Sequence, residues 1–290
     1  MYDTILLPYD GSDGARAVLD HVAELADATD ATVQVVYVAD TSRDSVTTVG
    51  SEVVDALEQE GEAVVEEAKG TLVTAGVDVE TDVVQGDPAA TVVEYADRYG
   101  ADLIVMPSRG RKGASRVLLG SVAEKVIRLS PVPVLTVRMR EDERLQFPYE
   151  RVLVPTDGSA AAGHAADHAV ALAATLGAEV DVLSVVDDGG LAADVRSLVG
   201  DEDDDSEATA AVQTVADAAA EQGVDAVTAV EHGSPAETIE AYVDANDIDL
   251  VVLGTTGRGG LDRLLLGSVA ERCARSVPVP VLTVPNQPDE

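Results

Sequence analysis

The chain has 290 residues, of which 54 are acidic and 19 are basic, so its formal net charge is −35. Such a charge would repel the phosphate backbone of DNA or RNA, which excludes a general nucleic-acid-binding role. A single cysteine excludes an internal disulfide framework.

The first half of the chain predicts strands that alternate with helices. Short apolar runs rich in β-branched residues indicate buried strands, and apolar residues at helical spacing indicate the helices between them. Ser12 and Asp87 are the predicted N-caps of the first and third helices, and a long helix is expected over Val53–Val73. Pro133 inside the fifth strand predicts an edge strand. The predicted strands are Thr4–Leu7, Val33–Val38, Val77–Val84, Leu103–Met106 and Val132–Val137.

The same pattern starts again at Arg151, with a constant offset of 147 residues, so that Pro8 matches Pro155. Between Val117–Val137 and Leu264–Val284, 15 of 21 positions are identical. A period of this size indicates that one domain has been duplicated, since the repeats of a solenoid are much shorter. Alternating strands and helices predict an α/β fold, with a parallel sheet covered on both faces in each copy.

The offset divides the chain into two predicted domains, residues 1–140 and 150–290, joined by a charged linker from Arg138 to Tyr149. The N-terminus lacks a targeting pattern and no apolar stretch is long enough to cross a bilayer, so we expect a cytoplasmic protein with no membrane contact. The chain has only three lysines. High acidity with few lysines favours solubility in concentrated salt, which predicts a halophilic archaeon as the source. The alternative is simply an acidic protein.

Each copy carries a glycine-punctuated loop between a predicted strand and a helix. A helix start behind such a turn suits phosphate, because its N–H groups are unpaired and its dipole end is positive. Ser268 with Glu271, and Ser121 with Glu124, have capping-box spacing, so both serines are predicted N-caps. The alternative is a turn and an ordinary cap without a ligand. The loops read Gly254-Thr255-Thr256-Gly257, nine residues, Gly267-Ser268, and Pro107-Ser108-Arg109-Gly110, nine residues, Gly120-Ser121.

Two aspartates, Asp10 and Asp157, are expected beside these loops. Ligands bind at the carboxyl ends of strands in open α/β sheets, and neighbouring first and fourth strands would bring each aspartate to its loop. There it would bind a ribose hydroxyl or a base amine, or hold a magnesium ion through water; the alternative is a turn or cap residue. Ten of the nineteen basic residues fall in the two loop–helix segments. Arg111 and Arg258 are the preferred phosphate ligands, with local charge balance as the alternative.

Other polar residues receive structural interpretations. Cys273 matches Val126 and is expected to be a small core residue. His21 and His168 occupy matching helix positions, which indicates packing, and with four histidines and no Cys-His cluster no metal site is assigned. The acidic run Asp201–Asp205 is expected to be a solvated loop, with a metal site as the less favoured alternative. Arg128 and Arg275 are interpreted as cations at helix C-termini.

These features together resemble the universal stress protein family. Its ATP-binding members carry Gly-x2-Gly-x9-Gly-Ser/Thr, which Gly254, Gly257, Gly267 and Ser268 match. The opening Pro-x-Asp-Gly-Ser, the Gly-x-Pro-Ala helix start and the closing Val-Pro-Val-Leu-Thr-Val are also similar to the family's, and each occurs twice. Pro107 departs from the pattern, because proline has a fixed φ and no N–H; the first site is therefore expected to bind more weakly, bind differently or be empty.

The resemblance implies two tandem Rossmann-like domains of the adenine nucleotide alpha hydrolase type, each with strand order 3-2-1-4-5 and helices on both faces. It implies adenine near the ends of the first two strands and triphosphate on the glycine loop. It also implies that the fifth strands, Val132–Val137 and Val279–Val284, pair within one chain as a pseudo-dimer, which a further homo-oligomer would extend. The implied nucleotide-binding residues are Pro8, Asp10, Val38, Ser108, Gly110, Arg111, Gly120, Ser121 and Val122, and Pro155, Thr156, Asp157, Val185, Gly254, Thr255, Gly257, Arg258, Gly267, Ser268 and Val269.

Three functions are left open by the sequence. The first is a stress-response protein that binds ATP, ADP or AMP, with or without Mg²⁺, and acts in a regulatory or protective way that depends on the nucleotide. The second is a slow ATP-hydrolysing enzyme, which is less favoured because no Walker lysine and no clear general base are present, so no catalytic residue is assigned. The third is an interaction module that no longer binds nucleotide.

Overall fold

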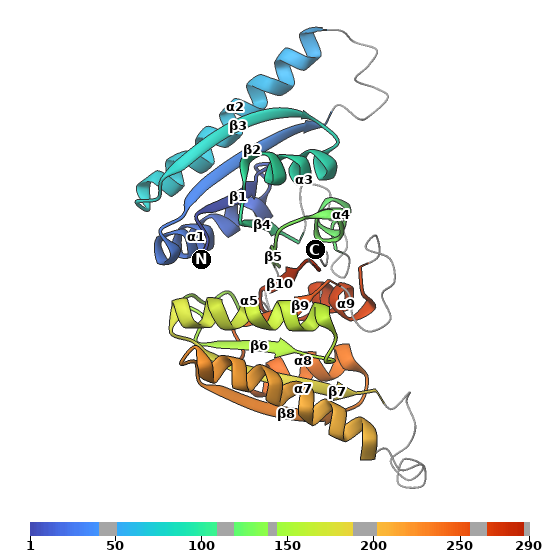
Figure 1. Cartoon of the computed structure of the whole chain (residues 1–290). Coiled ribbons are helices and arrows are strands. Elements are labelled where there is room, and N and C mark those ends of the chain that lie inside the picture. Colours follow the sequence, from blue (N-terminus) through green and yellow to red (C-terminus); the bar gives the residue numbers. More distant parts are fainter. Residues whose placement is uncertain (41–50, 109–118, 139–143, 188–201, 256–265, 287–290) are drawn as a thin grey trace. The chain divides into compact units, whose positions relative to one another are not determined.

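The computed structural model describes residues 1–40, 51–108, 119–138, 144–187, 202–255 and 266–286, without the side chains of residues 51–58 and 202–204. The chain forms two compact units, Met1–Glu141 (unit one) and Asp142–Glu290 (unit two), shown in Figure 1. Each unit is an α/β domain with a parallel sheet, as the sequence predicts.

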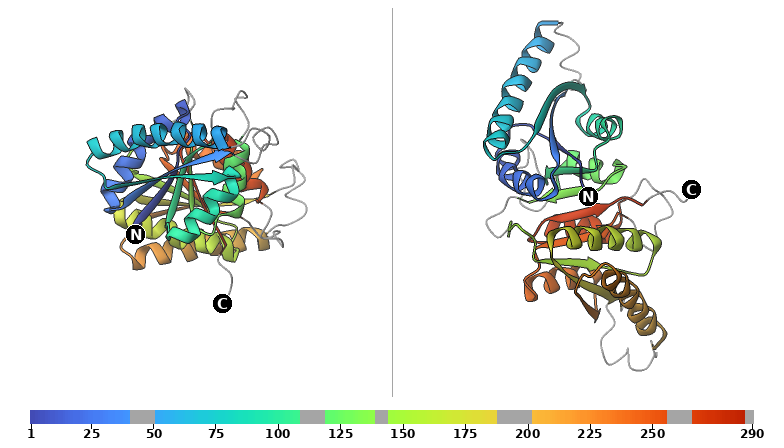
Figure 2. Two further views of the ribbon diagram at one scale, coloured as in Figure 1. Left: turned by 90° about the horizontal axis from the view of Figure 1, so that it is seen from above. Right: turned by 60° about the vertical axis from the view of Figure 1, so that its left-hand side comes forward.

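Unit one contains strands in the order β3-β2-β1-β4-β5, all paired in parallel. Helices α1 and α2 cover one face of this sheet and α3 and α4 cover the other (Figure 2). The elements are β1 (Thr4–Pro8), α1 (Asp13–Thr29), β2 (Thr32–Asp40), α2 (Ser51–Thr74), β3 (Val79–Gly86), α3 (Pro88–Tyr99), β4 (Leu103–Pro107), α4 (Ser121–Leu129) and β5 (Val134–Val137).

Unit two repeats this architecture with the order β8-β7-β6-β9-β10, again in parallel. Its core gathers apolar side chains of β6, β9 and β10 against α8 and α9, including Leu153, Val251 and Val281. The elements are β6 (Arg151–Pro155), α5 (Ala160–Leu176), β7 (Glu179–Val186), α7 (Glu202–Glu221), β8 (Ala226–His232), α8 (Pro235–Ala245), β9 (Leu250–Gly254), α9 (Ser268–Ser276) and β10 (Val281–Val284).

The central strands are buried on both faces, which explains their uninterrupted apolar sequences. Ile5, Leu6 and Leu7 of β1 have no exposed surface, and every residue of β4 is buried. At the amino end of unit one, the Asp102 carboxylate accepts hydrogen bonds from the backbone N–H groups of Asp3 and Thr4, both at 2.9 Å. This contact fixes the register of β1 beside β4, which the sequence places far apart.

Two helix starts confirm the predicted N-caps. The Ser12 hydroxyl accepts from the backbone N–H of Ala15, and the Asp87 carboxylate accepts from that of Ala90. Each satisfies one of the N–H groups that the first turn of a helix leaves unpaired.

Two sequence expectations about element boundaries are wrong. Pro133 lies before β5 rather than inside it, and its carbonyl accepts from Ile104 at 2.9 Å, so it gives no argument for an edge strand. The acidic run from Glu202 to Asp205 belongs to α7, because acidic residues suit the positive end of a helix dipole. Tyr149 lies between β5 and β6, within the predicted linker, but it is 1% exposed and matches the equally buried Tyr2 of unit one.

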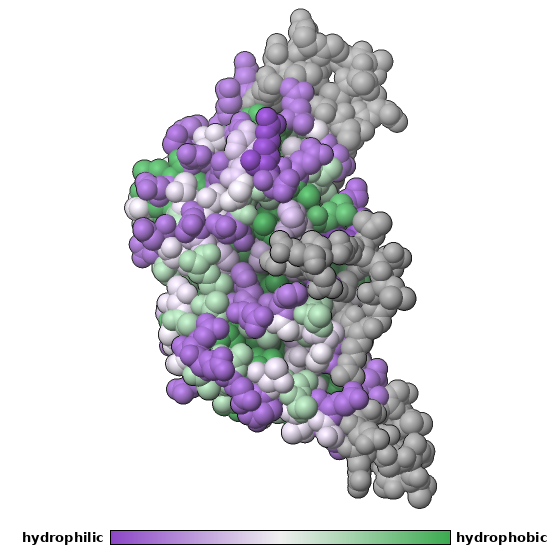
Figure 3. All heavy atoms as spheres, viewed as in Figure 1, coloured by the Kyte–Doolittle hydropathy of each residue, from purple (hydrophilic) through white to green (hydrophobic). Residues whose placement is uncertain are grey.

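The face drawn in Figure 3 is mostly hydrophilic, with scattered hydrophobic residues. Among the described residues, the large hydrophobic side chains that are exposed are Met1, Val73, Tyr99, Leu129 and Val227. None of the described helices combines the length and the apolar character that a membrane span requires.

Candidate functional site

The carboxyl ends of three adjacent strands form the candidate site of each unit. In unit one, the order β2-β1-β4 brings the ends of these strands to one edge of the sheet, with Val38 on β2, Asp10 after β1 and Ser108 after β4. In unit two, β7-β6-β9 does the same for Val185, Asp157 and Thr255. The prediction that the first and fourth strands are adjacent is therefore confirmed in both units.

A backbone hydrogen bond closes the turn between strand and helix in each unit. The Gly120 N–H donates to the Ser108 carbonyl at 2.7 Å, and the Gly267 N–H donates to the Thr255 carbonyl at 2.7 Å. The first helical bonds then run from Glu124 to the Gly120 carbonyl and from Glu271 to the Gly267 carbonyl, both at 2.9 Å. The backbone N–H groups just before these bonds lie at the positive end of the helix dipole.

The predicted capping boxes are wrong. Gly120 and Gly267 are the N-caps, with no side-chain capping bond, and Ser121 and Ser268 are the first helical residues. The glutamate of the second box is used elsewhere, since Glu271 pairs with Arg275 at 2.5 Å one turn further along α9. Neither helix start therefore has a capping bond from the side chain of its N-cap residue.

The two aspartates organise equivalent turns after β1 and β6. The Asp10 carboxylate accepts from the Ser12 N–H at 3.0 Å, and the Asp157 carboxylate accepts from the Ser159 N–H at 3.0 Å. Gly11, which lies between Asp10 and Ser12, has a φ of 69°, a conformation that glycine adopts at little cost. Both aspartates therefore have the turn role that the sequence analysis gave as the alternative to ligand binding. A carboxylate has about four acceptor positions, so a ligand hydroxyl or amine can share it.

The basic residues of the loop–helix segments fall into two groups, those outside the described residues and those on α4 and α9. Gly110, Arg111, Gly257 and Arg258 lie outside the described residues, as do the other cations of both loops. The described cations on α4 and α9 sit near carboxylates of their own unit, in the pairs Lys125–Asp87 (3.9 Å), Arg272–Glu237 (2.5 Å) and Arg275–Glu271 (2.5 Å). Local charge balance therefore explains these three, and Arg128 lies in the last turn of α4 as predicted.

Comparison with known proteins decides the family. The sequence profile of the universal stress protein family matches the chain twice, over residues 1–138 and 148–285. The chain belongs to the universal stress protein family. Universal stress protein MJ0531 of Methanocaldococcus jannaschii is 38% identical over 146 residues, which cover 49% of this chain and 86% of the relative. A universal stress protein of Mycolicibacterium smegmatis is 29% identical over 211 residues, which cover 73% of this chain and 70% of the relative.

A solved structure supports the tandem fold over the whole length. The crystal structure of a universal stress protein from Archaeoglobus fulgidus aligns with 98% of both chains, with a TM-score of 0.78 and 24% sequence identity. At this identity the likeness concerns the fold alone. The chain is thus a universal stress protein with two tandem Rossmann-like domains.

Two of the four histidines, His21 and His168, and the cysteine of this universal stress protein are packing residues. Burial lowers the pKa of His21 to about 4 and that of His168 to about 4. Burial also raises the pKa of the Cys273 thiol to about 12, and the side chain has no exposed surface. Among the described residues, no group of three or more His, Cys, Asp or Glu side chains is placed to hold a metal ion.

Sequence reasoning did not anticipate two contacts made by residues beside the aspartate turns. In unit one, the Arg16 guanidinium on α1 bonds the Glu67 carboxylate on α2. In unit two, the Thr156 hydroxyl accepts from the Gly158 N–H at 3.2 Å. The available signal was a difference between the copies at the offset of 147, since Arg16 matches Gly163 and Glu67 matches Thr214.

Proposed function

We propose that each unit binds an adenine nucleotide at the carboxyl edge of its sheet, and that the protein acts in the stress response in a regulatory or protective way that depends on this nucleotide. The observation that carries the proposal is the pair of glycine N-caps. Gly267 has φ −61° and ψ 142°, and Gly120 has φ −64° and ψ 142°. Any residue adopts these angles, so the backbone does not require glycine. Glycine here leaves room for a group that approaches the helix start closely.

The donors and acceptors at this edge suit a nucleotide. In this proposal, phosphate oxygens accept from the N–H groups of Ser121 and Val122 in unit one, and of Ser268 and Val269 in unit two, next to Gly120 and Gly267. The carboxylates after Pro8 and Pro155, on Asp10 and Asp157, accept from ribose hydroxyls or from the base amine. Val38 and Val185 are half-buried apolar contacts for the base. Ser108, Thr156, Gly254 and Thr255 line the same edge. Any Mg²⁺ would arrive with the phosphates.

The test is calorimetric titration of ATP with magnesium into the nucleotide-stripped protein in concentrated potassium chloride. We expect saturable binding to both units, tighter in unit two, where the glycine pattern is complete. Gly267→Val should weaken the tighter site by more than about tenfold, because the added side chain blocks the phosphates, while the melting temperature stays within a few degrees because valine fits the backbone angles.

Gly120→Val is the matched variant for the weaker site and should leave the tighter one intact. Unchanged ATP binding by a folded Gly267→Val protein would contradict the assignment of the phosphate site. Absence of binding by the unaltered protein would instead favour an interaction module. A steady-state ATP turnover that Asp157→Ala abolishes would favour the slow-enzyme alternative.

Pairing of the fifth strands within the chain, further homo-oligomerisation, the cytoplasmic location and the halophilic source stay predictions from the sequence.

A further inference from the structure

The equivalent aspartates of the two units are supported by different contacts. In unit two the support is local: the Thr156 hydroxyl accepts from the Gly158 N–H inside the turn that carries Asp157. Unit one has Tyr9 at the matching position. A tyrosine hydroxyl is too far from its own backbone to make that bond, so Tyr9 cannot replace the contact that Thr156 makes in unit two.

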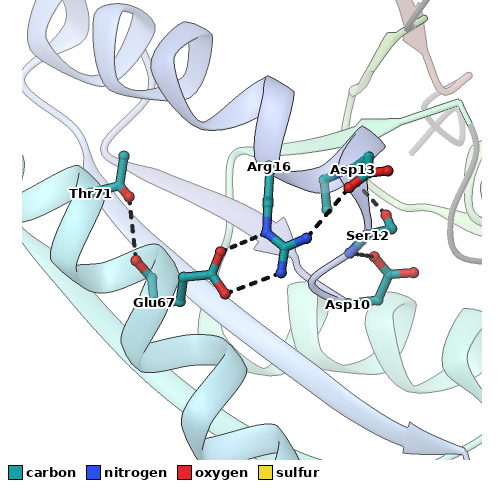
Figure 4. Close-up of polar contacts among 7 residues, drawn as sticks. Asp10, Ser12, Asp13, Arg16, Glu67 and Thr71 are labelled. Atoms are coloured by element: carbon teal, nitrogen blue, oxygen red, sulfur yellow. Dashed lines mark hydrogen bonds and ion pairs between the residues drawn. The ribbon is translucent and has the colours of Figure 1, made fainter.

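Unit one provides a contact between two helices instead. The Arg16 Nε donates to Glu67 Oε1 at 2.6 Å and one terminal nitrogen donates to Oε2 at 3.3 Å, so the fork of Arg16 is bidentate (Figure 4). The other terminal nitrogen lies 3.5 Å from Asp13 Oδ1. Bidentate pairs of arginine and carboxylate fix orientation as well as distance. Arg16 thereby links the first turn of α1 to the C-terminal half of α2.

This tie reaches Asp10 by two routes. Along the backbone, the Arg16 N–H donates to the Ser12 carbonyl at 2.9 Å, and the Ser12 N–H donates to the Asp10 carboxylate. Through side chains, the second route runs by Tyr9, which is 2% exposed. After burial, the Glu67 charge is the largest cause that raises the pKa of Tyr9, which indicates that the Tyr9 hydroxyl lies near the Glu67 carboxylate. Tyr9 directly precedes Asp10.

We propose that Arg16 and Glu67 are positioning residues for the nucleotide site of unit one: their ion pair holds the Tyr9–Ser12 turn, and with it the Asp10 carboxylate, in the geometry that meets the ligand. This inference rests on the proposed function, because Asp10 must face the nucleotide. The matching positions in unit two are Gly163 and Thr214, which cannot form the pair, so the effect is confined to unit one. Arg16 and Glu67 side chains are 48% and 45% exposed, and pairs this exposed add little to global stability. The loss should therefore appear in binding rather than in unfolding.

The test is a double-mutant cycle in the full chain with Gly267→Val, which confines ATP binding to unit one. We expect Arg16→Ala to weaken ATP binding about threefold to tenfold, and Asp10→Asn to weaken it at least as much. The double variant should bind no more than about twofold more weakly than Asp10→Asn alone. Once the carboxylate is absent, displacement of the turn that carries it has no further effect on binding. A purely structural role would make the two losses multiply.

Two controls accompany the cycle. Lys69→Ala removes a neighbouring exposed pair on α2, Lys69–Glu66 at 3.6 Å, which does not reach α1; it should leave ATP binding unchanged. Arg16→Lys keeps the charge but loses the fork, so it should restore only part of the affinity that Arg16→Ala loses.

The outcomes separate this inference from the function on which it rests. A loss with Asp10→Asn but none with Arg16→Ala overturns the positioning role and leaves the nucleotide site standing. Multiplicative losses also overturn it. Unchanged binding with Asp10→Asn overturns the positioning role and the assignment of Asp10 to the ligand, while the phosphate site is judged separately by Gly120→Val and Gly267→Val.

Discussion

The two units share the backbone of the site and differ in the side chains that support it. The bond that closes the strand–helix turn is 2.7 Å long in both, from Gly120 to Ser108 and from Gly267 to Thr255. The aspartate turn, in contrast, is supported by an ion pair between helices in unit one and by a threonine inside the turn in unit two. After duplication, the backbone geometry of the candidate site is thus the common part, and the side chains beside it have diverged.

A second difference lies in the sheets. In unit two, the buried Asp181 of β7 is bonded by the Arg151 guanidinium in a fork at 2.9–3.1 Å and by the Tyr242 hydroxyl at 2.9 Å. Burial and this aspartate raise the pKa of Tyr242 to about 12. Unit one has uncharged Gln34 in place of Asp181 and Thr4 in place of Arg151. The charged cluster is therefore a property of unit two alone.

The largest predicted effect breaks this cluster. Arg151→Thr leaves the Asp181 carboxylate, which has no exposed surface, without its counter-charge. We expect a loss of about 3–5 kcal/mol in the free energy of unfolding of unit two, measured by urea denaturation in concentrated salt.

Adding Asp181→Gln installs the pair of unit one in unit two and should recover most of this loss, since the buried charge is then gone. A double variant as unstable as Arg151→Thr would contradict the charge explanation and point to lost packing of the arginine stem.

The next effect concerns a feature that the units share, the buried histidine of the first helix. Burial lowers the pKa of His21 from 6.5 to about 4, so the unfolded chain binds more protons between these values. Its contribution to stability is complete above about pH 6.5 and is lost as the pH falls through about 4, with an upper limit of about 3 kcal/mol.

His21→Leu should therefore flatten the decline of stability between pH 6.5 and 4, measured as the difference between variant and unaltered protein at each pH. If the free energy of unfolding of the two proteins declined equally with pH, the pKa of His21 would not be lowered in the folded state.

The smallest effect exchanges the residues that end β4 and β9. Pro107 pairs with Val137 and Gly254 pairs with Val284 at the same place in the two sheets. Because proline lacks an N–H and fixes φ, Gly254→Pro should weaken ATP binding in unit two by about tenfold or less, and Pro107→Gly should strengthen it in unit one by a few-fold. Single-site titrations in the Gly120→Val and Gly267→Val backgrounds measure each change. Unchanged affinities would show that this position does not distinguish the sites.

Local patterns predicted the parts of this molecule that local chemistry determines. The alternation of strands and helices and the caps at Ser12 and Asp87 follow from neighbouring residues, and the repeat at 147 residues follows from direct comparison of the two halves of the sequence. The capping boxes failed because the spacing of Ser268 and Glu271 does not reveal that Arg275 binds the glutamate. The α7 start failed because an acidic run suits both a solvated loop and the first turn of a helix.

The supports of the site were out of reach for a different reason. Arg16 and Glu67 are 51 residues apart in sequence and meet only after α1 and α2 have packed together. The residues near Tyr9 in sequence do not predict which side chains it contacts, and its burial depends on the same packing of helices. Unit two has Gly163 and Thr214 at the positions of this pair. Only a comparison of the two copies therefore shows that the units differ at these positions.

Amide hydrogen exchange of the nucleotide-free and ATP-saturated protein tests the central claim most directly, because it locates the ligand on the backbone. The account predicts slower exchange at the helix starts, Ser268–Ala270 and Ser121–Ala123, and at the turns after β1 and β6. Saturable ATP binding with protection confined to other segments would contradict it.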